Sequence, residues 1–142
     1  MATLNKRNTE SLVTRDELSS FIDRYGDLPG EVTIGLGAVR LYCTKVRAGR
    51  LIACVKIQPI NWYQADLSHL VVHPEYRRHG IAHSLLGIAC QRARADDCRL
   101  VQATICHNNV PAENLFRASG FMSSVSFVGL SGRTLFVWSR SV

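Results

Sequence analysis

The chain has 142 residues, 46% of them hydrophobic and 20% charged, which is enough for one domain with a substantial core. Its formal net charge of +6, from seventeen basic against eleven acidic residues, raises the question of a nucleic-acid partner. The basic residues are dispersed and aromatic residues are not interleaved with them, so nucleic-acid binding is not favoured.

No segment predicts a membrane span or an export signal. The longest wholly apolar run, residues 51–55, is far too short to cross a bilayer, and residues 1–8 contain no apolar signal segment. The five cysteines are odd in number and form no C-x-x-C pair, which argues against a disulfide framework and against a zinc ribbon. We therefore expect a cytoplasmic protein without a membrane partner, whose cysteines mostly pack in the core.

The first half of the chain predicts one short helix followed by strands. Residues 14–25 open with a Thr-x-x-Glu capping box and place their apolar side chains on one helical face, and Gly26 can end this helix. Residues 1–12 show no clear period and are expected to be partly disordered. Strand-like composition then recurs in three segments, residues 32–36, 39–46 and 51–57.

A strand, a loop and a helix follow one another without pause in the central part of the chain. Pro74 has no N–H and ends the strand, and beyond the loop apolar residues recur at three- and four-residue spacing. The loop combines the low bulk of Gly80 and Ala82 with two arginines, Arg77 and Arg78. Because it lies at a helix N-terminus, it is either a site for a phosphate-bearing ligand or an ordinary basic connection.

The second half predicts a buried strand at residues 100–106, a second helix, and a terminal hairpin with strands at 121–128 and 134–138. A strand on each side of a long helical crossover implies parallel pairing. Pro111 is tolerated in the first turn of the second helix, and Gly120 ends it. The pattern as a whole is α/β with a mixed sheet.

Two stretches resemble signatures of the GCN5-related N-acetyltransferase (GNAT) superfamily. Arg77-Arg-His-Gly-Ile-Ala82 matches R/Q-x-x-G-x-G/A, and the segment from Asn109 to Phe121 is similar to the later motif N-x-x-A-x-x-L-Y-x-x-x-G-F. The order and separation of the two motifs also agree with the family. The resemblance implies a single α/β domain over residues 1–142, with a mixed, centrally splayed β-sheet flanked by helices. It also implies acetyl-CoA as acyl donor and an amine as the usual acceptor.

By this resemblance, coenzyme A binds along the central strand, at the loop after it, and at the second motif. Backbone N–H groups of a bulged central strand would hold the pantetheine arm. The cofactor-binding residues assigned in this way are Leu70, Val71, Val72, Arg77, Arg78, His79, Gly80, Ile81, Ala82, Asn109 and Phe116. His79 and His83 have a spacing that can bind a metal, but no acidic third ligand stands at a recognisable spacing, so no metal is expected.

Two residues of the central strand are candidate general bases. Strand alternation predicts that Asp66 and Leu70 lie on one face of the sheet and His69 on the other. Asp66 matches the position where several GNAT enzymes carry the base that deprotonates the amine, which requires burial to raise its pKa toward neutrality. It is otherwise a hydrated residue at a strand edge. His69 is the rival base, because the ordinary pKa of histidine is near neutral.

The sequence departs from the family at Phe116, where the motif usually has a tyrosine placed to protonate the departing thiolate. Phe116 cannot donate a proton, so another group or water serves, or the protein binds coenzyme A without efficient turnover. The preferred function is an acetyl-CoA-dependent N-acyltransferase acting on a primary amine of a small molecule or a protein. Two alternatives stay open, acylation of a charged tRNA or another nucleic-acid-bound amine, and a catalytically weak coenzyme A-binding or sensing module. A homodimer is also left open.

Overall fold

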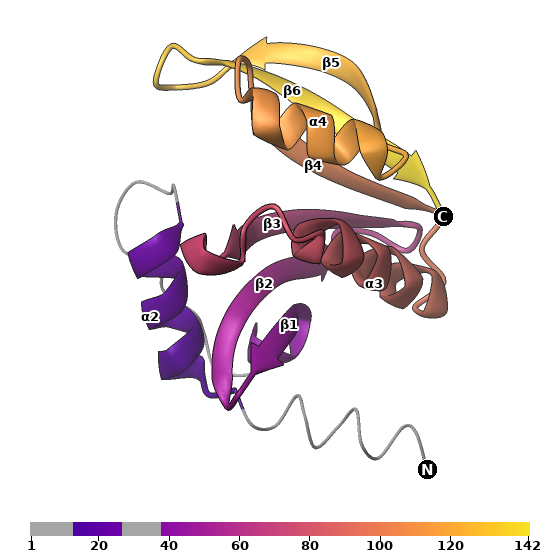
Figure 1. Ribbon diagram of the computed structural model, residues 1–142. Coiled ribbons are helices and arrows are strands. Elements are labelled where there is room, and N and C mark those ends of the chain that lie inside the picture. Colours follow the sequence, from indigo (N-terminus) through magenta and orange to yellow (C-terminus); the bar gives the residue numbers. More distant parts are fainter. Residues whose placement is uncertain (1–12, 27–37) are drawn as a thin grey trace.

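The computed structural model describes residues 13–26 and 38–142, which form a mixed sheet flanked by helices (Figure 1). Within this part of the chain the sheet has six strands in the order β1-β2-β3-β4-β6-β5. Neighbouring strands are antiparallel except β3 and β4, which are parallel. The α/β architecture with a mixed sheet is therefore confirmed. The strands are β1 (Tyr42–Arg47), β2 (Arg50–Pro59), β3 (Gln64–Val72), β4 (Leu100–Cys106), β5 (Met122–Val128) and β6 (Thr134–Ser141).

Helices cover both faces of the sheet. They are α2 (Arg15–Tyr25), α3 (Ile81–Ala95) and α4 (Val110–Ala118), with two short 3-10 helices, η1 (Ala38–Leu41) and η2 (Pro74–Tyr76). α3 and α4 pack on one face, called here the front face, and α2 packs on the opposite, back face. α3 is the crossover that makes β3 and β4 parallel, because it carries the chain from one strand to the start of the next.

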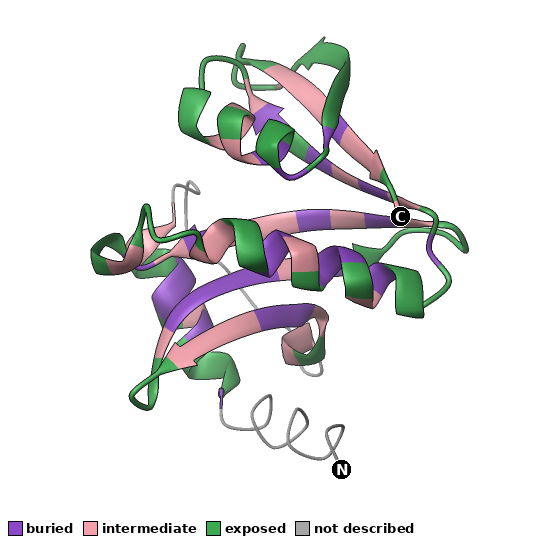
Figure 2. Ribbon diagram, turned by 45° about the vertical axis from the view of Figure 1, so that its right-hand side comes forward, coloured by how far each residue is buried: buried purple, intermediate pink, exposed green. Residues whose placement is uncertain are grey.

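Two apolar clusters of buried residues lie on the two faces of the sheet. Figure 2 marks the buried stretches of the helices and strands in purple. The front cluster joins the inner sides of α3 and α4 to the sheet and includes Leu85, Leu86, Phe116, Phe121 and Trp138. The back cluster joins α2 to β1, β2 and β3, and its buried members are Val13, Leu18, Phe21, Ile22, Tyr42, Cys54 and Val71. β2 is thus buried from both sides, as its nearly continuous apolar sequence predicts.

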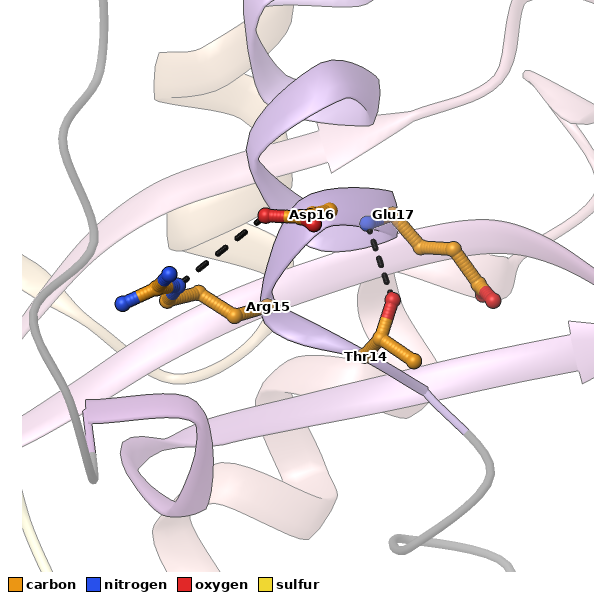
Figure 3. A network of polar contacts seen from close by, with 4 residues as sticks. All are labelled: Thr14, Arg15, Asp16 and Glu17. Atoms are coloured by element: carbon orange, nitrogen blue, oxygen red, sulfur yellow. Dashed lines mark hydrogen bonds and ion pairs between the residues drawn. The ribbon is translucent and has the colours of Figure 1, made fainter.

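α2 forms at the position that its capping box predicts. The hydroxyl of Thr14 accepts a hydrogen bond from the backbone N–H of Glu17 at 3.1 Å (Figure 3). The backbone N–H of Gly26 closes the other end on the carbonyl of Ile22 at 2.8 Å. These contacts satisfy backbone groups that a helix end otherwise leaves without partners.

Two expected segments differ from the structure or lie outside it. The strand predicted at 39–46 begins only at Tyr42, and the residues before it form η1. Arg92 of α3 donates hydrogen bonds to the carbonyls of Arg40 and Tyr42, a tertiary contact that local composition does not encode. The strand predicted at 32–36 and the disorder predicted for 1–12 lie outside the described residues.

The described residues also bear on the cysteines and on membrane contact. All five cysteines lie in the described part of the chain, and none of them forms a disulfide. Four are buried and Cys106 is partly buried, which agrees with the core-packing interpretation. Among the helices of residues 13–26 and 38–142, none has the length and apolar character needed to span a bilayer.

Candidate active site

The sheet opens at its centre, between the parallel strands β3 and β4. Gln64 to Leu67 of β3 pair with Leu100 to Ala103 of β4, and the pairing stops there although both strands continue. The two strands then diverge along the rest of their length (Figure 1). The end of β3 therefore faces an opening on this side, and the central splay expected from the resemblance is confirmed.

β3 carries a bulge where it leaves β4. Two residues of β3, His69 and Leu70, oppose one residue of β2, Val55, so the register between the strands shifts by one position. His69 adopts a φ of +51°, a left-handed conformation that residues other than glycine seldom adopt. The structure thus contains the bulged central strand that the resemblance implied.

The bulge corrects the expected alternation of side chains along β3. Leu70 packs against the front cluster, whereas Val71 belongs to the back cluster. The imidazole of His69 contacts Tyr42 of the back cluster, so it also lies on the back face. The expectation that His69 and Leu70 follow simple alternation was wrong, because the extra residue of the bulge reverses the parity beyond it.

Asp66 lies on the back face in the paired part of β3. Its chain neighbours Ala65 and Leu67 point into the front cluster, and Gln102 of β4 stands directly beside it. Burial raises the pKa of the Asp66 carboxyl, while a hydrogen bond from Gln102 and the charge of Lys56 act in the opposite direction. The net effect is a raised pKa, so the carboxylate is a stronger base than an ordinary exposed aspartate.

His69 and Tyr42 form a hydrogen-bonded pair on the same back face. The Tyr42 hydroxyl lies 2.6 Å from Nδ1 of His69, and the two rings stack with their centroids 5.9 Å apart. Burial lowers the pKa of the His69 imidazole, and the charge of Lys56 lowers it further. Burial raises the pKa of Tyr42 to about 12, and the nearby Cys54 thiol adds to the rise. Both rings are therefore neutral at physiological pH.

The chain leaves β3 through a tight loop that ends at the N-terminus of α3. Arg78 and Gly80 take positive φ values of 66° and 75°, and α3 starts at Ile81. The first helical hydrogen bond runs from the N–H of Ser84 to the carbonyl of Gly80, so the amides before Ser84 have no helical acceptor. A Cβ added to Gly80 would meet no other described atom within 4 Å. The loop therefore presents open backbone donors, which suits a phosphate.

The two loop arginines have different surroundings. Arg77 donates from Nε to the carbonyl of Val72 at 3.0 Å and from Nη2 to the carbonyl of Tyr25 at 3.4 Å. Arg78 and His79 are exposed beside it. Arg77 therefore joins the loop to the C-terminal end of α2, whereas the side chains of Arg78 and His79 are exposed to solvent.

The second motif forms α4 with the cap that its sequence predicts. The side-chain oxygen of Asn109 accepts a hydrogen bond from the N–H of Ala112 at 3.3 Å. Phe116 is buried in the front cluster, where its ring meets that of Phe121 edge-on at a centroid distance of 5.0 Å. Asn109 thus caps α4 through its side-chain oxygen, and Phe116 offers only an aromatic ring.

An open groove of about 550 Å³ lies between α2 and the turn joining β1 to β2. Its charged lining residues are Asp16, Glu17, Arg24 and Arg50. The first two stand in the first turn of α2 (Figure 3). The groove borders the helix that packs on the back face, the face that carries Asp66.

No group of three or more histidine, cysteine, aspartate or glutamate side chains in the described residues is arranged to hold a metal ion. Nδ1 of His83 lies 3.1 Å from the hydroxyl oxygen of Ser119, which joins α3 to α4. His79 is exposed in the loop. The two histidines, four positions apart, thus have different surroundings, His83 in a contact between helices and His79 in the exposed loop before α3.

A family model described as the acetyltransferase (GNAT) family matches residues 11–121. The chain belongs to this family. The match includes the opening, the loop and both motifs, so the geometry described above is that of a GNAT domain. No curated protein sequence matches the chain.

Solved structures with the same fold agree with the family. Ard1 from Thermoplasma volcanium superposes with a TM-score of 0.80 at 16% identity, covering 92% of this chain and 94% of that one. For the ribosomal-protein-alanine N-acetyltransferase from Brucella melitensis the TM-score is 0.71 at 17% identity, with 92% and 97% covered. A GNAT family acetyltransferase from Elizabethkingia anophelis, solved with acetyl-CoA bound, gives 0.63 at 10% identity, with 71% and 75% covered. At these identities the likeness shows the fold alone.

In this GNAT domain most residues assigned from the sequence follow one another along the chain, from the end of β3 to the first turn of α3. Leu70, Val71 and Val72 form the end of β3 along the opening, and Ile81 and Ala82 form the first turn of α3. The loop between them connects the opening to the helix N-terminus. The exceptions are Asn109, which caps α4, and Phe116 on α4, whose ring is buried in the front cluster.

Sequence reasoning missed three side chains around the two candidate bases. They are Tyr42, Lys56 and Gln102. Lys56 had a signal, because it is a single charge within an otherwise apolar strand. Tyr42 and Gln102 had none, because only the pairing of distant strands brings them beside β3.

Proposed function

We propose that the protein transfers an acetyl or related acyl group from acetyl-CoA to a primary amine of a small molecule or a protein. The observation that carries this proposal is the continuity of the opening between β3 and β4 with the exposed N-terminus of α3. A donor with phosphates at one end and a thioester at the other fits such a path, with its phosphates at the loop. The acetyl-CoA bound in the Elizabethkingia GNAT structure supports this choice of donor.

The donor would be held mainly by backbone groups. The amides of Ile81 and Ala82, together with the side chains of Arg78 and His79, would bind the phosphates at the loop. The end of β3 has no strand partner on the side of the opening, so its N–H groups can bond the pantetheine arm. Asn109 would add a side-chain amide at the start of α4.

The reaction forms one bond and breaks one. The amine nitrogen attacks the thioester carbonyl carbon, the carbon–sulfur bond breaks, and the amine loses a proton while the sulfur leaves as thiolate. Asp66 would accept the proton, directly or through a water, because its pKa is raised above that of an ordinary carboxyl. Backbone N–H groups at the bulge would stabilise the negative charge that develops on the carbonyl oxygen.

Departure of the sulfur needs no strong acid. A thiol has a pKa near 8.5, so the thiolate is a reasonable leaving group and water can supply its proton. Phe116 stands where the family motif usually has a tyrosine, and its ring has no proton to give. We therefore propose an enzyme that works without the usual phenol.

Two alternatives each have one observation in their favour. The net charge of +6 favours an amine carried on nucleic acid, such as a charged tRNA. Phe116 favours a coenzyme A-binding module with weak turnover. The cytoplasmic location and the homodimer considered from the sequence stay predictions.

A single screen tests the proposal. The protein is incubated with acetyl-CoA and a panel of small amines, peptides with free N-termini and aminoacyl-tRNA, and the release of free thiol is followed. Thiol release that depends on one class of small or peptide amine is the expected result. Release with aminoacyl-tRNA alone would favour the first alternative, and acetyl-CoA binding without release on any amine would favour the second.

A further inference from the structure

Tyr42 on β1 and His69 on β3 lie 27 residues apart in sequence, and their side chains meet at the bulge of β3. The Tyr42 side chain is 3% exposed, so its hydroxyl is removed from solvent. A buried hydroxyl needs an acceptor for its proton. Among the described residues, Nδ1 of His69 is the hydrogen-bond partner of this hydroxyl, at 2.6 Å. Tyr42 is therefore the donor, and the lone pair of Nδ1 is the acceptor.

The charge state of His69 follows from the groups around it. Lys56 on β2 is the charged residue that acts on the imidazole, and it opposes protonation together with burial. Tyr42 on β1 and Cys54 on β2 are neutral, because the pKa of each is raised to about 12. α2 packs on this face through its apolar side chains, Leu18, Phe21 and Ile22. A neutral imidazole whose Nδ1 accepts a hydrogen bond carries its proton on Nε2.

We infer that Tyr42 is a positioning residue that holds His69 as the neutral tautomer with its proton on Nε2, so that His69 anchors the bulge and cannot serve as general base. Only the statement that His69 cannot serve as general base rests on the proposed function. Nδ1 is occupied by the phenol, and Nε2 already carries a proton, so neither nitrogen can take one from the amine. Asp66 on the same face then stands as the base, and His69 can only donate from Nε2.

The backbone at the bulge agrees with an anchoring role. His69 holds a left-handed φ of +51°, which costs free energy for a residue with a side chain. Cys54 donates a weak hydrogen bond from Sγ to the carbonyl of His69 at 3.5 Å. The imidazole of His69 is thus tied to β1 and its carbonyl to β2.

The tautomer can be measured without any assumption about activity. Nitrogen-15 NMR of the histidine ring distinguishes the two neutral tautomers and follows their titration. We expect His69 to show the form protonated at Nε2 and to titrate below the ordinary histidine pKa. Tyr42→Phe removes the donor that favours the neutral ring, so the pKa of His69 should rise by about one unit, or about tenfold in proton affinity. Tyr63→Phe removes a phenol from the exposed β2–β3 turn and should leave this titration unchanged.

A substitution at His69 tests the catalytic clause. Asparagine tolerates a left-handed φ and can place its side-chain oxygen near the position of Nδ1, but it cannot accept a proton at neutral pH. His69→Asn should therefore keep the pH–rate profile of the wild type, whereas His69→Ala should melt earlier because the phenol loses its acceptor.

Several results would overturn the inference. One is a His69 ring protonated at Nδ1, and another is a His69 titration that Tyr42→Phe and Tyr63→Phe change equally. A third is a folded His69→Asn protein that binds acetyl-CoA but whose turnover no longer rises with pH as it does in the wild type, which is the result expected for a lost base. If the wild type transfers no acyl group to any amine, the proposed function fails, while the NMR experiments still decide the tautomer.

Discussion

The guanidinium of Arg77 donates a hydrogen bond to the backbone carbonyl of Tyr25, with 3.4 Å between Nη2 and the oxygen. Tyr25 is the last residue of α2, where the helix dipole places partial negative charge. The same guanidinium bonds the carbonyl of Val72 at the end of β3. Arg77, in the loop before α3, thus connects α2 to β3.

Arg77→Ala should therefore act first on stability. We expect the free energy of unfolding to fall by about 1 kcal/mol, because two exposed hydrogen bonds from a charged donor are lost. Arg78→Ala is the matched control, since it removes the same charge from the adjacent exposed position. It should melt like wild type and bind acetyl-CoA more weakly. Thermal unfolding and calorimetric titration separate the two effects, and equal melting of both variants would contradict the structural role of Arg77.

Gly80→Val should abolish the binding of acetyl-CoA. The φ of Gly80 is +75°, and no described atom would obstruct a Cβ there, so the variant adds backbone strain and a side chain facing the phosphate site. Gly132→Val is the matched control, because Gly132 has a φ of +79° and similarly open surroundings in the β5–β6 turn. Both variants should lose comparable stability, of about 1–2 kcal/mol. If Gly80→Val binds as tightly as Gly132→Val, the loop is not the phosphate site.

Asp66→Asn should lower turnover and leave the affinity for acetyl-CoA nearly unchanged, because the base acts on the amine. In the wild type, turnover should rise with pH through the raised pKa of Asp66 and then level off. A variant with wild-type turnover and an unchanged pH–rate profile would assign the base to another group or to solvent.

Asp66→Asn should raise the stability of the folded protein although it lowers turnover. A carboxyl whose pKa is raised by folding destabilises the folded protein when it ionises, so its cost appears as the pH rises from the unfolded to the folded pKa. Asp66→Asn should therefore melt at a higher temperature than wild type at pH 7. The difference should disappear below about pH 4, where the carboxyl is protonated in both states. Melting temperatures across this range check the sign, and a lower melting temperature for the variant at pH 7 would contradict it.

Phe116→Tyr tests the missing phenol. Because Phe116 is buried, an added hydroxyl should cost about 1–3 kcal/mol of stability unless it finds an acceptor. A hydroxyl that reaches the sulfur should raise the rate of the chemical step by up to about a hundredfold, the lower end of general acid catalysis, because a thiolate leaves readily. Single-turnover thiol release measures this step.

Phe121→Tyr provides the matched control for that experiment. Its ring is also buried and packs against Phe116, so the added hydroxyl carries the same stability cost, but Phe121 does not stand at the tyrosine position of the family motif. An equal rate change in both variants would mean that the hydroxyl acts through packing. A wild type and a Phe116→Tyr variant that both bind acetyl-CoA and release no thiol with any amine would favour the sensing module.

The features that the sequence by itself determined are local ones. Thr14 and Asn109 cap their helices because a cap involves residues within one turn of the chain. Gly80 before an apolar helical pattern marks the loop for the same reason, since a left-handed residue and a helix start are read from neighbours in sequence. The two motifs that contain Gly80 and Asn109 were sufficient to predict the family, and the order of strands and helices predicted the mixed sheet.

The arrangement around the candidate bases was decided by tertiary structure. The bulge at His69 lies where β3 still pairs with β2 on one side but has left β4 on the other, and strand alternation alone predicts the wrong face for His69. Lys56 and Tyr42 reach this face through strand register, which shifts every side chain when it changes by one residue. The raised pKa of Asp66 depends on burial by elements distant in the chain. Register and burial are properties of the assembled sheet, so no local pattern in the sequence contains them.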